Sequence, residues 1–187
     1  FLEEAYEAVD ALDLDDPVLM CEELGDVLMQ VAFHTCMEQE TGRFTWEQVC
    51  DGVCQKLIER HPNIFGTQPG YEGITDWDAL KNKEKGRRTL ADDLESVPRA
   101  MPALMRAAKL QKRAARHGAA LQGADAAALA DAAENLQTAQ PASAQAEQAV
   151  GELLFAAANL ARQAGVDPEQ ALQKANEAFC TAAGPVA

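Results

Sequence analysis

The sequence has little positive charge. Across its 187 residues, 16 Lys and Arg side chains stand against 30 Asp and Glu, which gives a formal charge of −14. Proteins that grip a nucleic-acid backbone use Lys and Arg to release its counterions, so this balance excludes a nucleic-acid polymer as the expected partner. A small phosphate ligand is still compatible with it, because a metal ion and a few local cations can reverse the field at one site.

Long apolar runs and paired cysteines are also missing. No stretch of ~18 apolar residues is present, and no basic, apolar leader opens the chain, so we expect no membrane association. The five cysteines are an odd number without paired spacing, which suits reduced thiols better than a disulfide framework. From these features we expect a soluble, cytoplasmic protein.

Strand-like alternation is nearly absent, whereas helix boundaries recur, and the expected fold class is all-α. Asp16-Pro17 and Asp167-Pro168 each supply an N-cap followed by a proline in the first turn, and Thr45 to Gln48 forms a capping box. We expect helices at about residues 1–12, 17–40, 46–61, 102–117 and 124–139, and two more after a break at 141–143. The Gly- and Pro-bearing residues 63–74 indicate a loop, and the charged stretch through Glu95 indicates a linker.

The two halves of the chain resemble each other. Residues 24–28 (LGDVL) match 150–154 (VGELL), and Glu47-Gln48 matches Glu169-Gln170 about twenty residues later. This pattern predicts a tandem duplication, with lobes at residues 1–95 and 96–187.

Two acidic pairs in the first lobe are candidate metal ligands. Glu4 and Glu7 are three residues apart, as are Glu23 and Asp26, so each pair lies on one helix face. If the two helices pack antiparallel, four carboxylates converge, and their repulsion calls for a cation. Oxygen ligands without His or Cys suit Mg²⁺ or Mn²⁺. The alternative from the pattern alone is two solvated acidic faces.

Basic and aromatic residues further along are candidate phosphate and base contacts. Lys56 and Arg60 are four residues apart on one expected helix, and Lys81 follows Trp77 by four. The cations can neutralise phosphate oxygens, and the indole can stack on a base. By themselves these residues fit equally a solvated stripe and a packing tryptophan.

These motifs together resemble the MazG-type nucleoside triphosphate pyrophosphohydrolases. Glu3 to Glu7 is similar to that family's EExxE motif and Glu23 to Asp26 to its ExxD motif; residues 42–44, 56–66, 77–81 and 102–104 resemble further landmarks. The resemblance implies that Glu4, Glu7, Glu23 and Asp26 bind Mg²⁺, with Mn²⁺ as a substitute, and act in catalysis. It places Lys56, Arg60, Trp77 and Lys81 at the substrate.

The implied reaction converts a nucleoside triphosphate (NTP or dNTP) and water to the monophosphate and pyrophosphate, a housecleaning of nucleotides, in an enzyme expected to be a homodimer. Two alternatives stay open. The chain fits a noncatalytic helical scaffold or nucleotide sensor, and dUTP and phosphoribosyl-ATP pyrophosphohydrolases share the acidic all-α architecture, although His61-Pro62 and Trp77 with Lys81 favour MazG.

The second lobe departs from the family pattern. The expected second EExxE falls near Glu134 to Thr138, where Asn135 and Thr138 stand at ligand positions, and the second ExxD runs from Ala149 to Glu152. Of the four positions only Glu152 keeps a carboxylate in this alignment. We therefore expect a second lobe that is structural and catalytically inactive.

Overall fold

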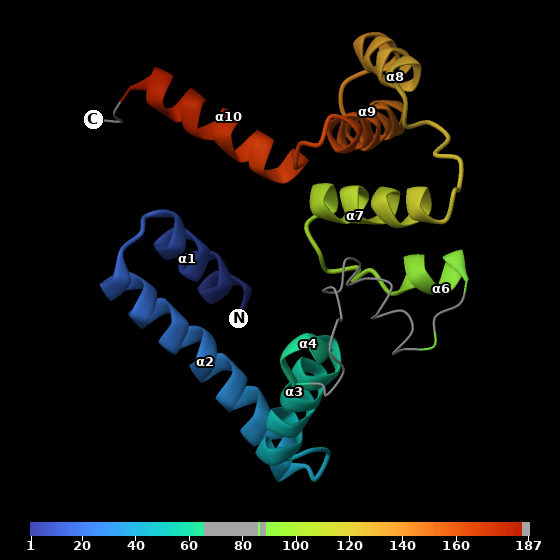
Figure 1. Ribbon diagram of the computed structural model, residues 1–187. Helices are drawn as coiled ribbons and strands as arrows, with labels where there is room; N and C mark the ends of the chain where they lie inside the picture. The colour runs from blue at the N-terminus through green and yellow to red at the C-terminus, as the bar shows by residue number, and fades with distance from the viewer. Residues whose placement is uncertain (66–85, 87–88, 185–187) are drawn as a thin grey trace. The chain divides into compact units, whose positions relative to one another are not determined.

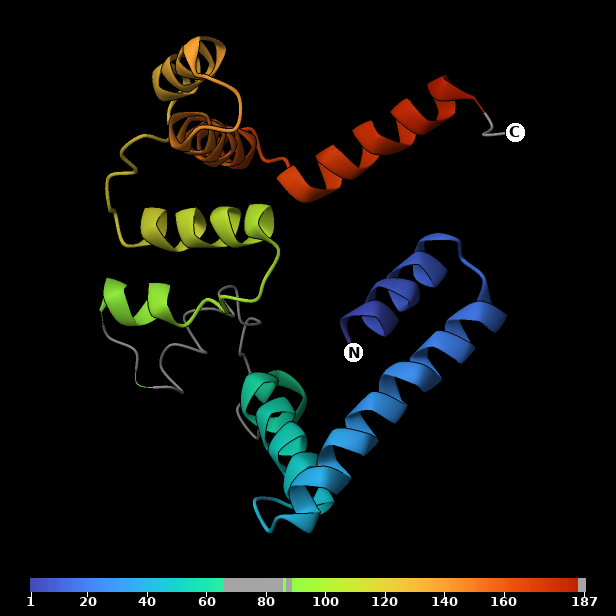
Figure 2. The same cartoon turned by 180° about the vertical axis from the view of Figure 1, so that it is seen from behind.

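The computed structural model describes residues 1–65, 86 and 89–184, and every regular element in these ranges is an α-helix. The all-α prediction is confirmed for the described chain (Figures 1 and 2). The helices run in the order α1 (Leu2–Asp13), α2 (Pro17–Glu40), α3 (Trp46–Arg60), α4 (Pro62–Phe65), α6 (Leu90–Glu95), α7 (Ala103–Arg116), α8 (Ala126–Thr138), α9 (Ala144–Gln163) and α10 (Pro168–Ala183).

The chain forms two compact units, residues 1–80 and 81–187. The division lies upstream of the expected boundary at residues 95 and 96, and it assigns α6 to the second unit. The reason is visible in the packing, because α6 contacts α7. In the first unit α2 contacts both α1 and α3; in the second, α9 contacts α7, α8 and α10.

Local capping explains where most helices begin. The Asp16 carboxylate accepts hydrogen bonds from the amides of Val18 (2.9 Å) and Leu19 (3.2 Å) at the start of α2. Thr45 and Gln48 form the expected reciprocal capping box at the start of α3. Asp167 caps α10 in the same way as Asp16 caps α2. Such side chains satisfy amides that have no partner within the helix.

Two short helices correct the sequence expectations. Pro62–Phe65 is a helical turn, α4, where the expected loop begins, and Leu90–Glu95 is a helix, α6, inside the expected linker. Thr89 caps α6 through a capping box whose third helical residue is Asp92. Asp93 in this helix is 1% exposed. The charged stretch through Glu95 predicted a linker, but Asp93 is instead buried against α7.

The helix interfaces are filled mainly by small side chains. In the first unit the buried apolar residues are Ala8 and Ala11 of α1. In the second unit they are Val97 and six alanines, among them Ala132 of α8 and Ala149 and Ala156 of α9. Alanines at these positions let α8 and α9 approach closely.

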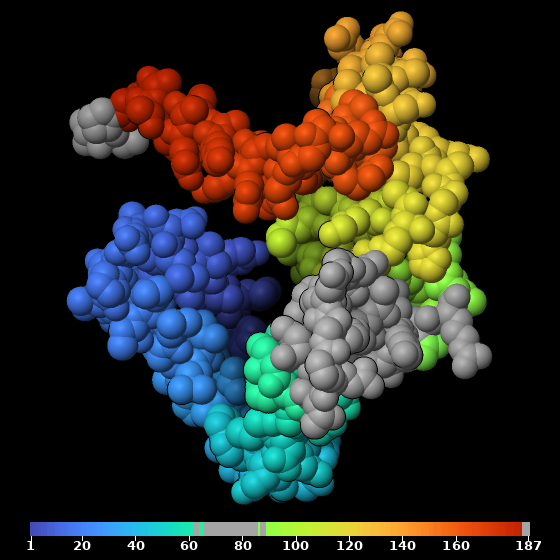
Figure 3. Space-filling model, in the orientation of Figure 1, coloured from blue at the N-terminus to red at the C-terminus, as the bar shows by residue number. Residues whose placement is uncertain are grey.

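The last helix is largely uncovered. Apart from Pro168 and Glu169, the residues of α10 are exposed, including Phe179 at 74%. Figure 3 shows α10 extending from the end of α9 with most of its atoms on the surface. Among the described residues, no helix is both long and apolar enough to cross a membrane.

Candidate metal centre

The first two helices form an antiparallel hairpin. Residues 14–16 connect α1 to α2, and the two helices lie side by side in both views (Figures 1 and 2). Asp15, just before the N-cap of α2, has φ 52°, which turns the chain sharply between them. A hairpin of this kind places the first turns of α1 against the middle of α2. The two acidic motifs therefore face the same interface.

Three of the four expected ligands converge there. Carboxylate oxygens of Glu4, Glu7 and Glu23 all lie within 4.8 Å of one another. Glu4 and Glu23 are half-buried, while Glu7 is exposed to solvent. Asp26 is half-buried one turn after Glu23 but does not belong to this group. The hairpin thus brings together Glu4, Glu7 and Glu23, with Asp26 at its edge.

The electrostatics of the cluster act on Glu23. Partial burial raises the pKa of its carboxyl above the ordinary 4.5, and the negative charges of Glu7 and Asp26, then those of Glu22 and Glu4, raise it further. The ionised cluster is therefore unfavourable without a counter-charge, and no Lys or Arg occurs anywhere between residues 1 and 40. A divalent cation would relieve this repulsion.

The donor set fits a hard cation. All three converging ligands offer carboxylate oxygens, with neither His nor Cys among them. Such oxygens suit Mg²⁺ and Mn²⁺ rather than zinc, which is usually bound by Cys and His. One side of the cluster is open to solvent at Glu7, which leaves room for water and phosphate oxygens around the ion.

One residue of this site is missing from the sequence expectations. Gln30 of α2 is half-buried, and its side-chain amide nitrogen lies 3.4 Å from Oε1 of Glu4. It follows Glu23 by seven residues and Asp26 by four, so the three share one helix face. This spacing was a usable signal, but only the register of the hairpin shows that Gln30 meets Glu4.

The expected substrate contacts are only partly described. Lys56 is exposed and Arg60 half-buried, one turn apart near the C-terminal end of α3. They lie on a different helix from the acidic cluster, within the same unit. Trp77 and Lys81 lie outside the described residues. Their assignment to substrate stays a prediction.

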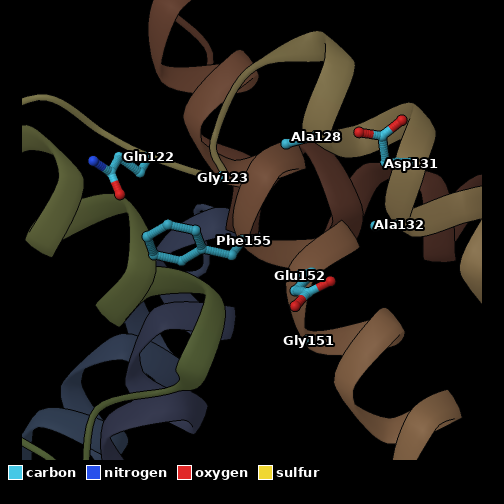
Figure 4. Close-up of a pocket in the computed structure, with 8 residues that line it drawn as sticks. All are labelled: Gln122, Gly123, Ala128, Asp131, Ala132, Gly151, Glu152 and Phe155. Carbon is cyan, nitrogen blue, oxygen red and sulfur yellow. The ribbon is translucent and has the colours of Figure 1, made fainter.

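A second helical hairpin, formed by α8 and α9, lies in the second unit. Residues 139–143 connect α8 to α9, and Ala142, just before the N-cap Ser143, has φ 57°, like Asp15 in the first hairpin. A pocket of about 510 Å³ lies on this second hairpin (Figure 4). It is lined by Gln122, Gly123, Ala128, Asp131, Ala132, Gly151, Glu152 and Phe155.

This pocket changes the expected pairing within the second lobe. Extended without a gap, the match of residues 24–28 with 150–154 pairs Glu4 and Glu7 with Ala130 and Ala133. The connection 139–143 is two residues longer than 14–16, which moves these partners two residues earlier in α8. They are Ala128 and Asp131, rather than Asn135 and Thr138. The second lobe therefore keeps two carboxylates, Asp131 and Glu152, while Ala128 and Ala149 replace the other two.

These features define a class of protein: an all-α chain whose described residues include two helical hairpins, one of which carries a carboxylate cluster suited to a divalent cation. Comparisons with known proteins agree. Residues 1–65, which include the four acidic positions with Lys56 and Arg60, match the model of the MazG nucleotide pyrophosphohydrolase domain.

Curated relatives extend the match over nearly the whole chain. The chain is 39% identical over 187 residues to the nucleoside triphosphate pyrophosphohydrolase of Escherichia coli K12, covering 95% of this chain and 71% of that protein. It is 38% identical over 180 residues to the nucleoside triphosphate pyrophosphohydrolase/pyrophosphatase MazG of Thermotoga maritima, covering 95% and 69%. A Mycobacterium tuberculosis nucleoside triphosphate pyrophosphohydrolase is 36% identical over 121 residues, covering 63% and 36%. The chain belongs to the MazG family of nucleotide pyrophosphohydrolases, a family of enzymes.

Proposed function

We propose that this chain is a Mg²⁺-dependent nucleoside triphosphate pyrophosphohydrolase that uses its first lobe. The observation that carries this proposal is the convergence of Glu4, Glu7 and Glu23 within 4.8 Å in the α1–α2 hairpin. Membership of the MazG family and the names of its relatives supply the reaction class. The substrate is an NTP or dNTP, and the products are the monophosphate and pyrophosphate.

We assign different roles to the acidic, basic and aromatic side chains. Glu4, Glu7, Glu23 and Asp26 hold the ion, which when bound stabilises charge on the phosphoryl oxygens. One of these carboxylates accepts the proton of the attacking water, since the cluster offers the bases near the reacting phosphorus. Lys56 and Arg60 neutralise the departing pyrophosphate, and Trp77 with Lys81 contacts the rest of the nucleotide.

Product identity tests this proposal. The chain is incubated with a panel of NTPs and dNTPs in the presence of Mg²⁺, and the products are separated by ion-exchange chromatography. Equal amounts of monophosphate and pyrophosphate are expected, and Glu23→Ala should abolish both. A panel that yields no monophosphate at any Mg²⁺ concentration would leave the noncatalytic scaffold or nucleotide sensor as the function.

We also propose that the chain works as a homodimer. Apolar side chains are exposed on several sides of α2, including Leu24, Leu28, Phe33 and Met37 at 52–60%. A helix that is apolar on most of its circumference is normally buried, so the faces of α2 not covered by α1 and α3 need another surface. A second copy supplies one of matching character.

Light scattering coupled to size-exclusion chromatography tests the dimer. A mass of twice 20.1 kDa is expected, and a monomer at every protein concentration would contradict it. The five described cysteines are exposed free thiols, which is consistent with the reducing cytoplasm as the compartment in which we propose that the protein works.

A further inference from the structure

Gln30 stands apart from the other polar residues of the α1–α2 hairpin because it contacts a candidate ligand without being one. Its amide nitrogen donates to Oε1 of Glu4 at 3.4 Å, across 26 residues of sequence. This is at the long end of hydrogen-bond distances. Both side chains are half-buried, so the contact is shielded from solvent more than an ordinary surface pair.

The chemistry of the amide suits a residue that holds a metal ligand. A carboxylate that accepts a hydrogen bond on one oxygen keeps the other oxygen for a cation, and its orientation is fixed by the donor. A lysine or arginine at this place would compete with the ion for the negative charge of Glu4. A neutral amide orients the carboxylate and leaves its charge intact.

The second lobe offers an internal comparison. The match of residues 24–28 with 150–154 aligns Ala156 with Gln30, and Ala156 is completely buried. In the same lobe Ala128 and Ala149 stand where the first lobe has Glu4 and Glu23. The second lobe therefore has neither the side-chain amide of Gln30 nor the carboxylate of Glu4 that this amide contacts.

We propose that Gln30 is a positioning residue for the acidic cluster, which holds Glu4 through one oxygen so that the other can bind the divalent ion. This inference rests on the proposed function, since it assumes that the cluster binds a cation. It adds a residue outside the two acidic motifs to the machinery of the first lobe.

Metal binding by the ion-free protein tests the proposal separately from catalysis. Gln30→Met keeps the length of the side chain but removes its donor, and Gln30→Ala removes both. Each metal-free variant is titrated with Mn²⁺, and free Mn²⁺ is followed by electron paramagnetic resonance. Both variants are expected to bind Mn²⁺ about tenfold more weakly than the native chain, the lower end of the effect of outer-shell partners.

A matched control lies on α3. The Gln55 amide donates to Oε1 of Glu59 at 2.8 Å, which is the same kind of contact in an exposed place away from the cluster. Gln55→Met should bind Mn²⁺ as the native chain does. Because the loss in Gln30→Met is one of ion affinity, excess Mg²⁺ should restore its kcat, and its metal-free melting temperature should stay close to the native one.

The proposed function and the proposed role of Gln30 predict different outcomes. If the native chain binds no Mn²⁺ and releases no pyrophosphate from any NTP, the proposed function fails. If the native chain does both and Gln30→Met binds Mn²⁺ equally well, the role of Gln30 is overturned while the function stands. A loss in Gln30→Ala without one in Gln30→Met would show that side-chain volume, and not the amide, matters, which also overturns the inference.

Discussion

Replacing Arg113 by methionine removes the cation from a buried ion pair that joins α6 to α7. Nη1 of Arg113 lies 3.0 Å from Oδ1 of Asp93, in a geometry that is ionic rather than a hydrogen bond, and it also donates to the Asp93 carbonyl and to Ser96 Oγ. The two side chains are 8% and 1% exposed. Among the described residues, the side-chain partner left to the Asp93 carboxylate in Arg113→Met is His117, whose Nε2 lies 3.2 Å from Oδ2.

The size of the effect follows from this burial. Removing one partner of a buried pair costs about 3–5 kcal/mol, because the other charge is left without compensation. In a unit of this size each kcal/mol lowers the melting temperature by about 4–8 °C, so a fall of at least ~12 °C is expected. Asp93→Asn combined with Arg113→Met should recover much of this loss, because no unpaired charge remains.

Urea unfolding followed by circular dichroism measures this cost. Lys112→Met is the control, since Lys112 is an exposed cation on the same helix, and its unfolding curve should coincide with the native one. If Arg113→Met loses less than about 1 kcal/mol, a value typical of surface pairs, the pair is not buried in solution as described and the argument is refuted.

Three further predictions concern the acidic hairpin. The pKa of Glu23 is raised in the native state, so the native state binds a proton more readily than the unfolded state does. Ionisation of Glu23 therefore destabilises the metal-free fold at neutral pH, and this destabilisation disappears as the pH falls toward 4.5. Metal-free Glu23→Gln should therefore melt above the native chain at pH 7 by calorimetry, with a difference that closes on acidification; a constant difference would contradict this. Adding Mg²⁺ should raise the native melting temperature and leave that of Glu23→Gln nearly unchanged, and EDTA should reverse the native shift. Glu7→Ala should abolish pyrophosphate release, whereas Asp131→Ala and Glu152→Ala should each leave it near the native rate. If Asp131→Ala and Glu152→Ala lost pyrophosphate release while Glu7→Ala kept it, the chemistry would belong to the second lobe.

The helix starts were predictable because their causes are local. Asp16, Thr45 and Asp167 each bond to amides two or three residues away, so the sequence itself contains both partners. The helix α6 was missed even though Thr89 and Asp92 form a local capping box at its start. The burial of its charge, in contrast, has a remote cause. Asp93 is buried by Arg113, twenty residues later, and nothing in the charged stretch around Asp93 indicates that pairing.

In the candidate site, too, features within one helix were predictable and contacts between helices were not. Spacing within each helix predicted the acidic pairs, and the hairpin brings Glu4, Glu7 and Glu23 together. The contact between Gln30 and Glu4 depends on how two helices are registered, which single-helix periodicity does not specify. The second hairpin was misaligned for a related reason: the sequence comparison paired Asn135 and Thr138 with the ligand positions, whereas Ala128 and Asp131 line the pocket with Glu152, and the length of the connection 139–143 was unknown from sequence.

The alanine-filled interfaces have a thermodynamic consequence. An alanine side chain removes little apolar area from water, so each buried position contributes less than the ~1.5–3 kcal/mol of a buried leucine or phenylalanine. Many of the larger apolar side chains of the first unit, such as Leu24 and Phe33, are exposed rather than buried within it. If association with a second copy covers it, folding and assembly are linked by mass action. The lobe that carries the acidic cluster would then be most fully formed where the protein is abundant, and dilution alone would weaken its hold on the ion.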